Sequence, residues 1–586
     1  MFVSKKFSRS QIFALSLISV LFVTACSPQK PESSNTTAST QQASSSNNDT
    51  LRLLYWQAPT ILNPHLTQGT KDYHASRITY EPLASHDKDG KLIPFLAAEI
   101  PTLENGGLTK DGKSVTWKLK QGVKWSDGKA FTAADVVFTY KFLSNPAVGA
   151  TTTAYYETIK SIEAIDDHTV KITFKDVNPA WSLPFVGQNG LILPQHIFEK
   201  YNGSNAREAP GNLRPVGTGP YRVVEFKPGD IVIFEPNSFF REPTESLFKR
   251  VELKGGGDVT SAARAALQTG DVDFAWNLQV EAPILKQLER VGKGKLVSSF
   301  GGLAERIFLN QTDPNKQTAD GDRSSLQFPH PFFTDKKVRQ AFSYAIDRDT
   351  IAKRLYGSTG RPIANTLVAP DIYNSPNTKY EFGLKQAAAL LDEAGWKDTN
   401  GNGIRDKNGV EMNVLFQTGV NPIRQKTQEI IKQALTSIGV KVELKNIDPS
   451  IYFSADPSNP DTTARFYADM QMYTNGNENP DPGAYMKTWT CDDIPQKKNN
   501  WSRYNVSRYC NPEYDKLWQQ STKELNSEKR RQLFIQMNDL LIKDAIVIPL
   551  IGRANVSAAS NRLAGVDLTP WDTDTWNIKD WRRNNN

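Results

Sequence analysis

The chain has 586 residues, of which 38% are hydrophobic and 23% are charged, and its formal net charge is +7. This charge excess is too small to indicate a nucleic-acid-binding protein. The length exceeds what one hydrophobic core usually holds, so we expect a globular protein of two or three lobes.

The first 25 residues have the pattern of a bacterial signal peptide. Three basic residues precede an apolar run over residues 12–25, which is too short to span a bilayer and ends at Cys26. Residues 23–26, VTAC, resemble the lipobox of bacterial lipoproteins, in which the cysteine sulfur receives a lipid. We predict that residues 1–25 are removed and that Cys26 anchors the protein to a membrane. The alternative is an ordinary signal peptide with a chance cysteine.

The segment that follows is predicted to be a disordered tether. Residues 26–49 consist almost entirely of Ser, Thr, Asn, Gln and Pro, so they cannot bury enough apolar surface to fold. No later apolar run is long enough to cross a membrane. These features predict an extracytoplasmic protein, on the periplasmic or cell-surface face, held by its lipid.

Two cysteines remain in the folded part, Cys491 and Cys510. An even pair in an oxidising compartment favours a disulfide that closes a local loop over a reactive thiol.

Two early segments show the alternation of a strand. They are residues 51–55 and 114–120, and in the second Val115, Trp117 and Leu119 face the same side. Thr132 and Asp135 have the spacing of a capping box, which predicts that a helix starts there.

The second half alternates helices with strands. Apolar spacing predicts helices over residues 338–346 and 430–438, a long helix from residue 526 or 527, and strands over residues 440–444 and 546–551. This order indicates α/β lobes, and no internal repeat is detectable.

Residues 107–114 fit the phosphate-loop pattern GxxxxGKS letter for letter, which makes an ATPase the rival interpretation. A phosphate loop must follow a buried strand and open a helix. Residues 101–105 are no hydrophobic strand, and the residues after Ser114 have the period of a strand. We therefore predict a β-hairpin.

A second motif imitates the start of a calcium loop, with oxygen ligands on alternate residues and a glycine at the turn. It comprises Asp398, Asn400, Asn402, Gly403 and Asp406. The closing glutamate is missing, because Gly409 occupies the twelfth position. A polar β-hairpin is favoured, with weak calcium binding as the alternative.

Catalytic and metal-binding motifs are missing from the sequence. The six histidines, at positions 65, 74, 86, 168, 196 and 330, show no spacing that places two on one helix face. No GxSxG nucleophile elbow occurs. We predict a protein that is not an enzyme and that carries no cofactor.

From Leu51 to its end, the chain resembles the extracytoplasmic solute-binding proteins of the oligopeptide and dipeptide class, called family 5. Six segments match the family's motifs in the family's order. They are residues 80–83 (YEPL), 117–136 (from WKL through WSDG to TAADV), 217–221 (GTGPY), 338–348 (VRQA and AIDR), 390–396 (LLDEAGW) and 548–550 (IPL).

The resemblance implies an α/β fold of two hinged lobes, the type II periplasmic-binding-protein fold with an extra subdomain in lobe I and a ligand cleft between the lobes. Expected boundaries are residues 50–78, 212–304 and 550–586 for the core of lobe I, 79–211 for its subdomain and 305–549 for lobe II. A hinge provides two states, of which an importer can recognise the closed one.

The resemblance also implies the function. We expect a monomer that captures peptides and delivers them to the permease subunits of an ABC transporter, with no nucleic acid as partner. One alternative is a non-peptide solute on the same scaffold, such as a nickel complex, an opine or a sugar. Another is a peptide-sensing or envelope lipoprotein without transport.

A peptide amine is a cation, and its burial requires a fixed carboxylate. In peptide-binding relatives an Asp three residues before an Asp-Pro pair supplies it. Aligning that pair on Asp481 and Pro482 places Glu478 at the amine position, with Asp481 as the alternative anchor. Glu478 could instead be a solvated loop acid.

Further expected contacts lie at the ends of strands and in the loops beyond them. They are Tyr55, Trp56, Thr70, Asp72, Trp276, Asn277, Tyr473 and Asn475, with Arg306 for a ligand carboxylate. Each aromatic could instead belong to a lobe core, and Asp72 could cap a helix.

Overall fold

The computed structural model describes residues 49–67, 69–454, 459–477 and 479–584. The predicted signal peptide, the lipid-bearing Cys26, nearly all of the predicted tether and Glu478 lie outside the described residues. Within the described ranges, no helix combines the length and the apolar character needed to cross a membrane.

One mixed sheet dominates the fold. Its strands are β1 (Thr50–Tyr55), β7 (Tyr221–Lys227), β8 (Ile231–Pro236), β9 (Arg250–Gly255), β10 (Phe274–Ala275), β11 (Gly294–Leu309), β12 (Gly360–Pro362), β15 (Asn413–Gly419), β16 (Lys441–Ile447), β17 (Met470–Asn475) and β18 (Val547–Ser560). They follow the order β16-β15-β17-β11-β18-β10-β1-β9-β8-β7, and β12 pairs with β18.

The pairing inside this sheet separates two parallel regions. Strand β1 runs parallel to β9 and β10, and β15 runs parallel to β16 and β17. The long strands β11 and β18 pair antiparallel between them. Open α/β sheets bind ligands at the carboxyl ends of their parallel strands. This sheet has two places of this kind, one in each parallel region.

Smaller sheets flank the main one. They are formed by β2 (Ala84–His86) with β3 (Leu92–Pro94), by β4 (Ser114–Lys118), β5 (Ile159–Asp166) and β6 (Thr169–Phe174), by β13 (Asp406–Lys407) with β14 (Val410–Glu411), and by β19 (Leu563–Ala564) with β20 (Arg582–Arg583).

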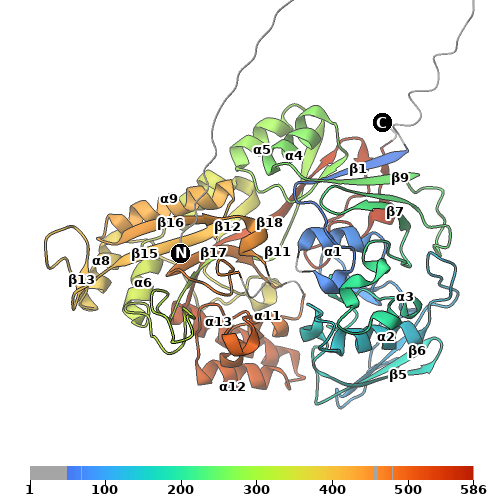
Figure 1. Cartoon of the computed structure of the whole chain (residues 1–586), viewed down its shortest axis with the longest axis horizontal. Coiled ribbons are helices and arrows are strands. Elements are labelled where there is room, and N and C mark those ends of the chain that lie inside the picture. Colours follow the sequence, from blue (N-terminus) through green and yellow to red (C-terminus); the bar gives the residue numbers. More distant parts are fainter. Residues whose placement is uncertain (1–48, 68, 455–458, 478, 585–586) are drawn as a thin grey trace, which may run out of the picture. The chain divides into compact units, whose positions relative to one another are not determined.

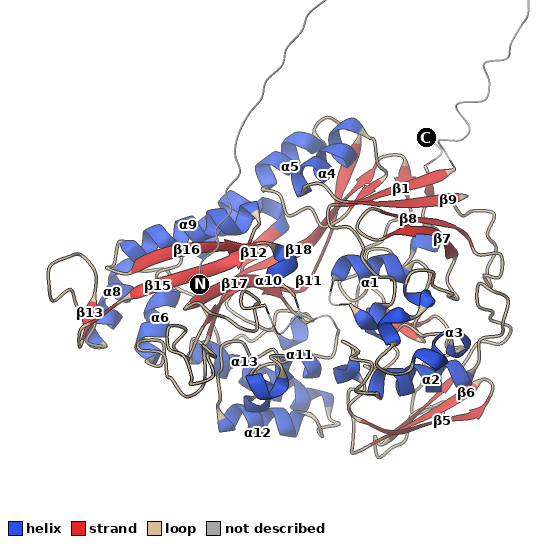
Figure 2. Ribbon diagram, in the orientation of Figure 1, coloured by secondary structure: helices blue, strands red, loops and turns tan. Residues whose placement is uncertain are grey.

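The helices are α1 (Thr70–Arg77), α2 (Ala133–Ser144), α3 (Gln195–Phe198), α4 (Val259–Arg264), α5 (Ala282–Glu289), α6 (Lys336–Tyr344), α7 (Arg348–Ile351), α8 (Leu384–Glu393), α9 (Pro422–Thr436), α10 (Pro449–Tyr452), α11 (Gly483–Lys487), α12 (Pro512–Ser521) and α13 (Ser527–Lys543). Helix α9 lies along β15 and β16 (Figure 1), and α2 lies beside β5 and β6 (Figure 2).

Local signals in the sequence place several of these elements correctly. Helix α2 starts after Thr132, whose N–H donates to Asp135 Oδ2 at 3.0 Å, as the predicted capping box requires. Residues 107–118 contain β4 and no helix. The phosphate-loop pattern therefore forms a turn that leads into a strand, and it does not open a helix as a phosphate loop must. The calcium-like segment leads into the hairpin of β13 and β14, which confirms the favoured interpretation.

Several predicted elements differ in length. The helix predicted over residues 430–438 spans Pro422–Thr436, and the strand predicted over residues 114–120 ends at Lys118. The helix predicted to reach residue 346 ends at Tyr344, because Asp347 caps the next helix by accepting a hydrogen bond from Thr350 N. The strand predicted over residues 546–551 extends to Ser560, because its polar second half pairs with β11.

Buried hydrophobic side chains form several clusters rather than one core. One cluster uses only residues between 66 and 209. Two others lie within residues 307–551. A further pair combines residues 51–288 with residues 554–581. The lobe boundaries given above stay a prediction.

Candidate ligand-binding site

An aromatic cluster stands at the carboxyl ends of the parallel strands β1 and β10. The ring of Tyr55 stacks on Trp276 with centroids 5.0 Å apart, and Trp276 stacks on Trp56 at 6.3 Å. Tyr55 and Trp276 are 0% and 2% exposed, whereas Trp56 is half-buried. Of the three rings predicted as contacts, Tyr55 and Trp276 therefore form the packed base of the cluster, and Trp56 is the accessible one.

Asn277 continues from this cluster. Its φ of +53° is in the left-handed region, which asparagine adopts more readily than most residues. Its N–H donates to Ser557 Oγ at 3.2 Å, and its carbonyl accepts from Trp56 Nε1 at 3.0 Å. Its Oδ1 accepts from Gln279 Nε2 at 3.1 Å. These bonds fix residues 277–280, which line a narrow pocket of about 20 Å³.

The two predicted contacts on α1 differ in exposure. Thr70 is the first residue of the helix and is exposed. Asp72 is 1% exposed, and its carboxylate accepts from Thr60 N and Thr67 Oγ1, each at 2.7 Å, and pairs with Lys71. Asp72 therefore holds the loop before α1 in place, and it is not the helix N-cap.

Arg306 lies on β11 and is 0% exposed. Its Nη1 donates to Asn475 Oδ1 and to the hydroxyl of Tyr485, and its Nη2 donates to the carbonyl of Thr366 at 3.1 Å. All of these acceptors are neutral. The predicted contacts Arg306 and Asn475 are thus bonded to each other, and the guanidinium fixes the side chain that ends β17.

Tyr473 belongs to the same paired strands, since it lies opposite Arg306 in the register of β11 and β17. Its ring stacks on Phe308 with centroids 4.5 Å apart, and Phe308 stacks on Trp489 at 5.8 Å. Burial raises the pKa of the Tyr473 hydroxyl above its usual value, so the group remains a neutral hydrogen-bond donor.

Asp481 forms an ion pair with Arg530. Both terminal nitrogens of Arg530 on α13 donate to its carboxylate, at 3.0 Å for Nη2 and Oδ1. Its Oδ1 also accepts from Gly483 N at 2.8 Å, at the start of α11. The alternative amine anchor is therefore engaged by an intramolecular cation, while Glu478, the first choice, lies outside the described residues.

The described residues beside position 478 pack against distant parts of the chain. A side chain at Gly302 would meet Asn477 O at 2.2 Å, and a Cβ atom at Gly90 would lie 3.3 Å from Pro480 Cγ. The side chain of Asn477 donates to Ala369 O at 3.2 Å. Glycine at position 302 is required by this close backbone approach.

A charged network that the sequence analysis missed connects β11, β17, β18 and α9. Arg424 Nε donates to Glu305 Oε1 at 2.8 Å. Thr474 Oγ1 donates to Glu305 and accepts from Arg424 Nη2 at 3.1 Å and from Arg553 Nε at 3.0 Å. None of these residues belongs to a recognisable motif, and only the strand pairing brings them together.

Four polar contacts join segments from different hydrophobic clusters. Lys487 pairs with Glu157 at 2.8 Å, Lys523 with Asp176 at 2.9 Å and Lys426 with Glu281 at 2.8 Å, and Asn421 Nδ2 donates to Gln279 Oε1 at 3.0 Å. At least one partner of each ion pair is exposed, so solvent screens the pair and each contributes little to stability.

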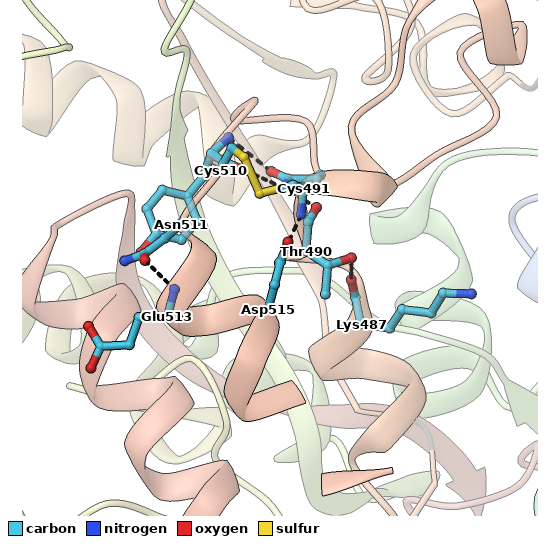
Figure 3. Close-up of a disulfide and its surroundings, with 9 residues drawn as sticks. Lys487, Thr490, Cys491, Cys510, Asn511, Glu513 and Asp515 are labelled. Carbon is cyan, nitrogen blue, oxygen red and sulfur yellow. Dashed lines mark hydrogen bonds between the residues drawn. A yellow bond between two sulfur atoms is a disulfide. The ribbon is translucent and has the colours of Figure 1, made fainter. Parts of the chain in front are cut away.

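The predicted disulfide is present. Cys491 and Cys510 are bonded, and Cys491 N donates to Asp515 Oδ1 at 3.1 Å on α12 (Figure 3). Asn511 caps α12 by accepting from Glu513 N at 2.9 Å (Figure 3). The bond therefore joins the segment after α11 to the start of α12.

Metal ligands do not gather in the described ranges, where no group of three or more His, Cys, Asp or Glu side chains could hold an ion. Three buried histidines are used in packing. Burial lowers the pKa of His65 to about 4, of His74 to about 3 and of His86 to about 4, so each ring is neutral at pH 7.

Known proteins resemble the chain along nearly its whole length. The family of bacterial extracellular solute-binding proteins, family 5 Middle, matches residues 91–496. The oligopeptide-binding protein AppA of Bacillus subtilis (strain 168) is 27% identical over 593 residues, which cover 98% of each chain.

Solved structures agree with this match. The structure of AppA from Bacillus subtilis in complex with a nonapeptide has a TM-score of 0.75 at 26% identity and covers 91% of this chain and 99% of that one. NikZ from Campylobacter jejuni in complex with Ni(L-His) has a TM-score of 0.76 at 24% identity, with coverages of 92% and 100%, and shows likeness of fold alone. The two-lobed α/β fold predicted from the sequence is confirmed.

Proposed function

The chain belongs to the bacterial extracellular solute-binding proteins of family 5, and from this premise we propose that it captures peptides and delivers them to an ABC importer. Members of this family act outside the cytoplasm, and the relatives compared here are solute-binding transport proteins rather than enzymes. Binding and release, without turnover, are therefore the proposed activity.

One observation carries the proposal of a binding site. Predicted contacts stand at the carboxyl ends of parallel strands in both parallel regions of the sheet. Trp56 and Asn277 follow β1 and β10, and Asn475 ends β17. Ligands of open α/β sheets bind at such ends. The backbone polar groups of an extended peptide need partners when buried, and the amide groups of Asn277 and Asn475 can supply them.

The amine of the peptide needs a carboxylate that has no competing cation. Asp481 already accepts hydrogen bonds from Arg530, so it offers an ammonium group little unshared charge. We assign the anchoring role to Glu478 on the sequence argument. Its side chain is one methylene longer than that of the aspartate that holds the amine in peptide-binding relatives.

The membrane anchor and the transporter complete the proposal. Lipidation of Cys26 would hold the protein near its permease, and residues 26–49 would give it reach. Replacement of Cys26 by Ser should release the protein from membranes, and detection of the unchanged membrane-bound form would contradict the anchor.

Transport is tested in the host. Deletion of the gene should reduce uptake of labelled peptides, and a crosslinker should capture permease subunits. Unchanged peptide uptake together with capture of a partner other than a permease would favour an envelope or sensing lipoprotein. A loss of uptake confined to a nickel complex, an opine or a sugar would replace the peptide by that solute.

A further inference from the structure

A narrow pocket lies where β18 meets α9 and the connector beyond β10. Its cavity volume is about 20 Å³, and the cavity opens to solvent. The lining comes from residues 277–280, from Tyr356 and Thr359, from Ile423, and from Arg553, Ala554 and Val556. Five of these ten residues are apolar and five carry a polar side chain, so the lining can contact both the polar and the apolar parts of a small ligand.

The hydrogen-bonded network that reaches this pocket through Arg553 has more positive than negative charges. Arg553 and Arg424 provide two positive charges, and Glu305 provides one negative charge within the same hydrogen-bonded network. The nearby pair of Lys426 and Glu281 is neutral as a whole. Desolvation lowers the pKa of Arg553 to about 10, so its guanidinium still carries its charge at pH 7. A partly buried net charge of this kind favours an anion.

Donors with no protein partner are available at the same place. Arg553 uses Nε for Thr474 and Nη1 for the carbonyl of Ala554, whereas Nη2 has no partner among the described residues. The hydroxyl of Tyr356 likewise has none there, and burial keeps its pKa above the usual value, so it remains a donor. Both donors therefore belong to residues that line the pocket, one on β18 and one in the helical turn that follows α7.

Helix α9 adds a third favourable feature. It is 15 residues long and its second residue, Ile423, lines the pocket. Its first turn carries the positive end of the helix dipole, and Asn421 caps only the N–H of Arg424. The helix terminus alone would not make a site. Here it stands beside the surplus positive charge of Arg553 and the two donors, Arg553 Nη2 and the Tyr356 hydroxyl.

We propose that this pocket binds a small anion through a carboxylate or similar oxyanion group, held by Arg553 Nη2, the hydroxyl of Tyr356 and the first turn of α9. One negative charge balances the network, and a two-oxygen group matches donors on two sides. The source is either a free anion such as formate or the carboxylate of the captured ligand.

The position of the pocket gives the anion a consequence for closure. Leu278, Val280, Ala554 and Val556 belong to one hydrophobic cluster, and Tyr356 and Ile423 belong to another. An anion held by groups from both sides stabilises the arrangement in which the two clusters meet. By linkage, it strengthens any ligand that needs the same arrangement.

The first experiment uses ¹³C-formate and the full mature protein without added peptide. NMR line broadening should saturate with formate in the wild type. Arg553→Gln should weaken formate binding about tenfold or more, the scale of a lost charge-assisted hydrogen bond. Arg361→Gln is the matched control, because Arg361 is exposed on β12, lies over Phe300 and does not line the pocket.

Broadening that never saturates, or equal affinity in a folded Arg553→Gln variant, would overturn the proposal. If Arg553→Gln does not fold, Tyr356→Phe decides, since it removes a hydroxyl that bonds to no described residue. A few-fold loss of formate affinity supports the site, and no loss overturns it. This experiment stands whether or not the protein transports peptides.

A second experiment identifies the source and rests on the proposed function. A peptide and its C-terminal amide are titrated with and without formate. If the peptide supplies the carboxylate, the amide binds about tenfold more weakly to the wild type, and Arg553→Gln removes that difference. If a free anion occupies the pocket, both peptides bind alike and formate tightens both. If both peptides bind alike and formate changes neither affinity, the proposed coupling is refuted.

Discussion

Asp481 and Arg530 form a bidentate ion pair that ties the start of α11 to α13. The side chains are 14% and 9% exposed, so the pair is largely removed from water. The acid that the sequence offered as a second anchor for a peptide amine is thus part of the internal framework. Replacement of Asp481 is therefore expected to have a different effect from replacement of Glu478.

Asp481→Asn should therefore act on stability. Loss of one partner leaves the guanidinium of Arg530 uncompensated, and the free energy of unfolding should fall by about 3 kcal/mol in urea titrations. Peptide affinity measured by calorimetry should change little in the folded fraction. Unchanged stability combined with lost affinity would make Asp481 the amine anchor.

Glu478→Gln should show the opposite pattern. Peptide binding should weaken by about 1.5 to 3 kcal/mol, the value of a hydrogen bond to a charged group, with unfolding unchanged. Glu443→Gln, at an exposed position on β16, is the control for loss of one acidic charge. Calorimetry that finds equal affinities for wild type and Glu478→Gln removes Glu478 from the site.

The contrast between local and long-range contacts explains what the sequence predicts. Neighbouring residues or residue type predict the capping box at Thr132, the disulfide and the strand over residues 114–120. All three are found, and the strand ends at Lys118. Arg306 and Asn475 are 169 positions apart, and Arg424 and Glu305 are 119 apart. No local pattern encodes such partners, because strand pairing creates them.

For a similar reason, the sequence could not show which of the aromatic residues predicted as ligand contacts are buried. A tyrosine or tryptophan at the end of a strand is equally suited to a core and to a ligand wall. No sequence pattern distinguishes Tyr55 and Trp276, which are buried, from Trp56, which is accessible. The order in which the three rings stack in the structure shows which of them can contact a ligand.

Arg306→Lys should lower both stability and affinity. A lysine ammonium cannot reproduce the planar set of bonds to Asn475, Tyr485 and Thr366, so a buried cation loses partners. We expect the free energy of unfolding to fall by about 2 kcal/mol and peptide affinity to fall because Asn475 is released. Arg361→Lys, at an exposed site, should change neither quantity. Equal effects of both variants in urea titration and calorimetry would contradict the role of Arg306.

Reduction of the disulfide should loosen the segment between α11 and α12. Cys491 and Cys510 are 19 residues apart, and a loop of this size is worth about 3 kcal/mol of unfolding free energy. The double variant with Ser at both positions should lose this amount and become insensitive to reductant. A wild-type unfolding curve that is the same with and without dithiothreitol would refute the prediction.

Acidification should destabilise the protein. Burial holds the pKa values of His65, His74 and His86 at about 4, 3 and 4, so the unfolded state binds protons first as pH falls below about 6.5. Their stabilisation is complete above that pH and is lost toward pH 4. Burial raises the pKa values of Asp493 and Asp574 to about 6, which acts in the opposite direction and reduces the slope.

His86→Gln isolates one part of this effect, because Nδ1 of His86 has no hydrogen-bond partner in the described chain. The loss of unfolding free energy between pH 7 and pH 5 should shrink by about 2 kcal/mol relative to wild type. Urea titrations at both pH values measure it. An identical loss in the variant would show that His86 does not titrate as its burial requires.

The central claim is that the protein carries peptides. Native mass spectrometry of protein purified from its own host measures the bound species directly. We predict a series of masses that fragment as peptides of differing sequence. A single bound mass that fragments as a metal complex, an opine or a sugar would contradict the claim and assign this member of family 5 to another solute.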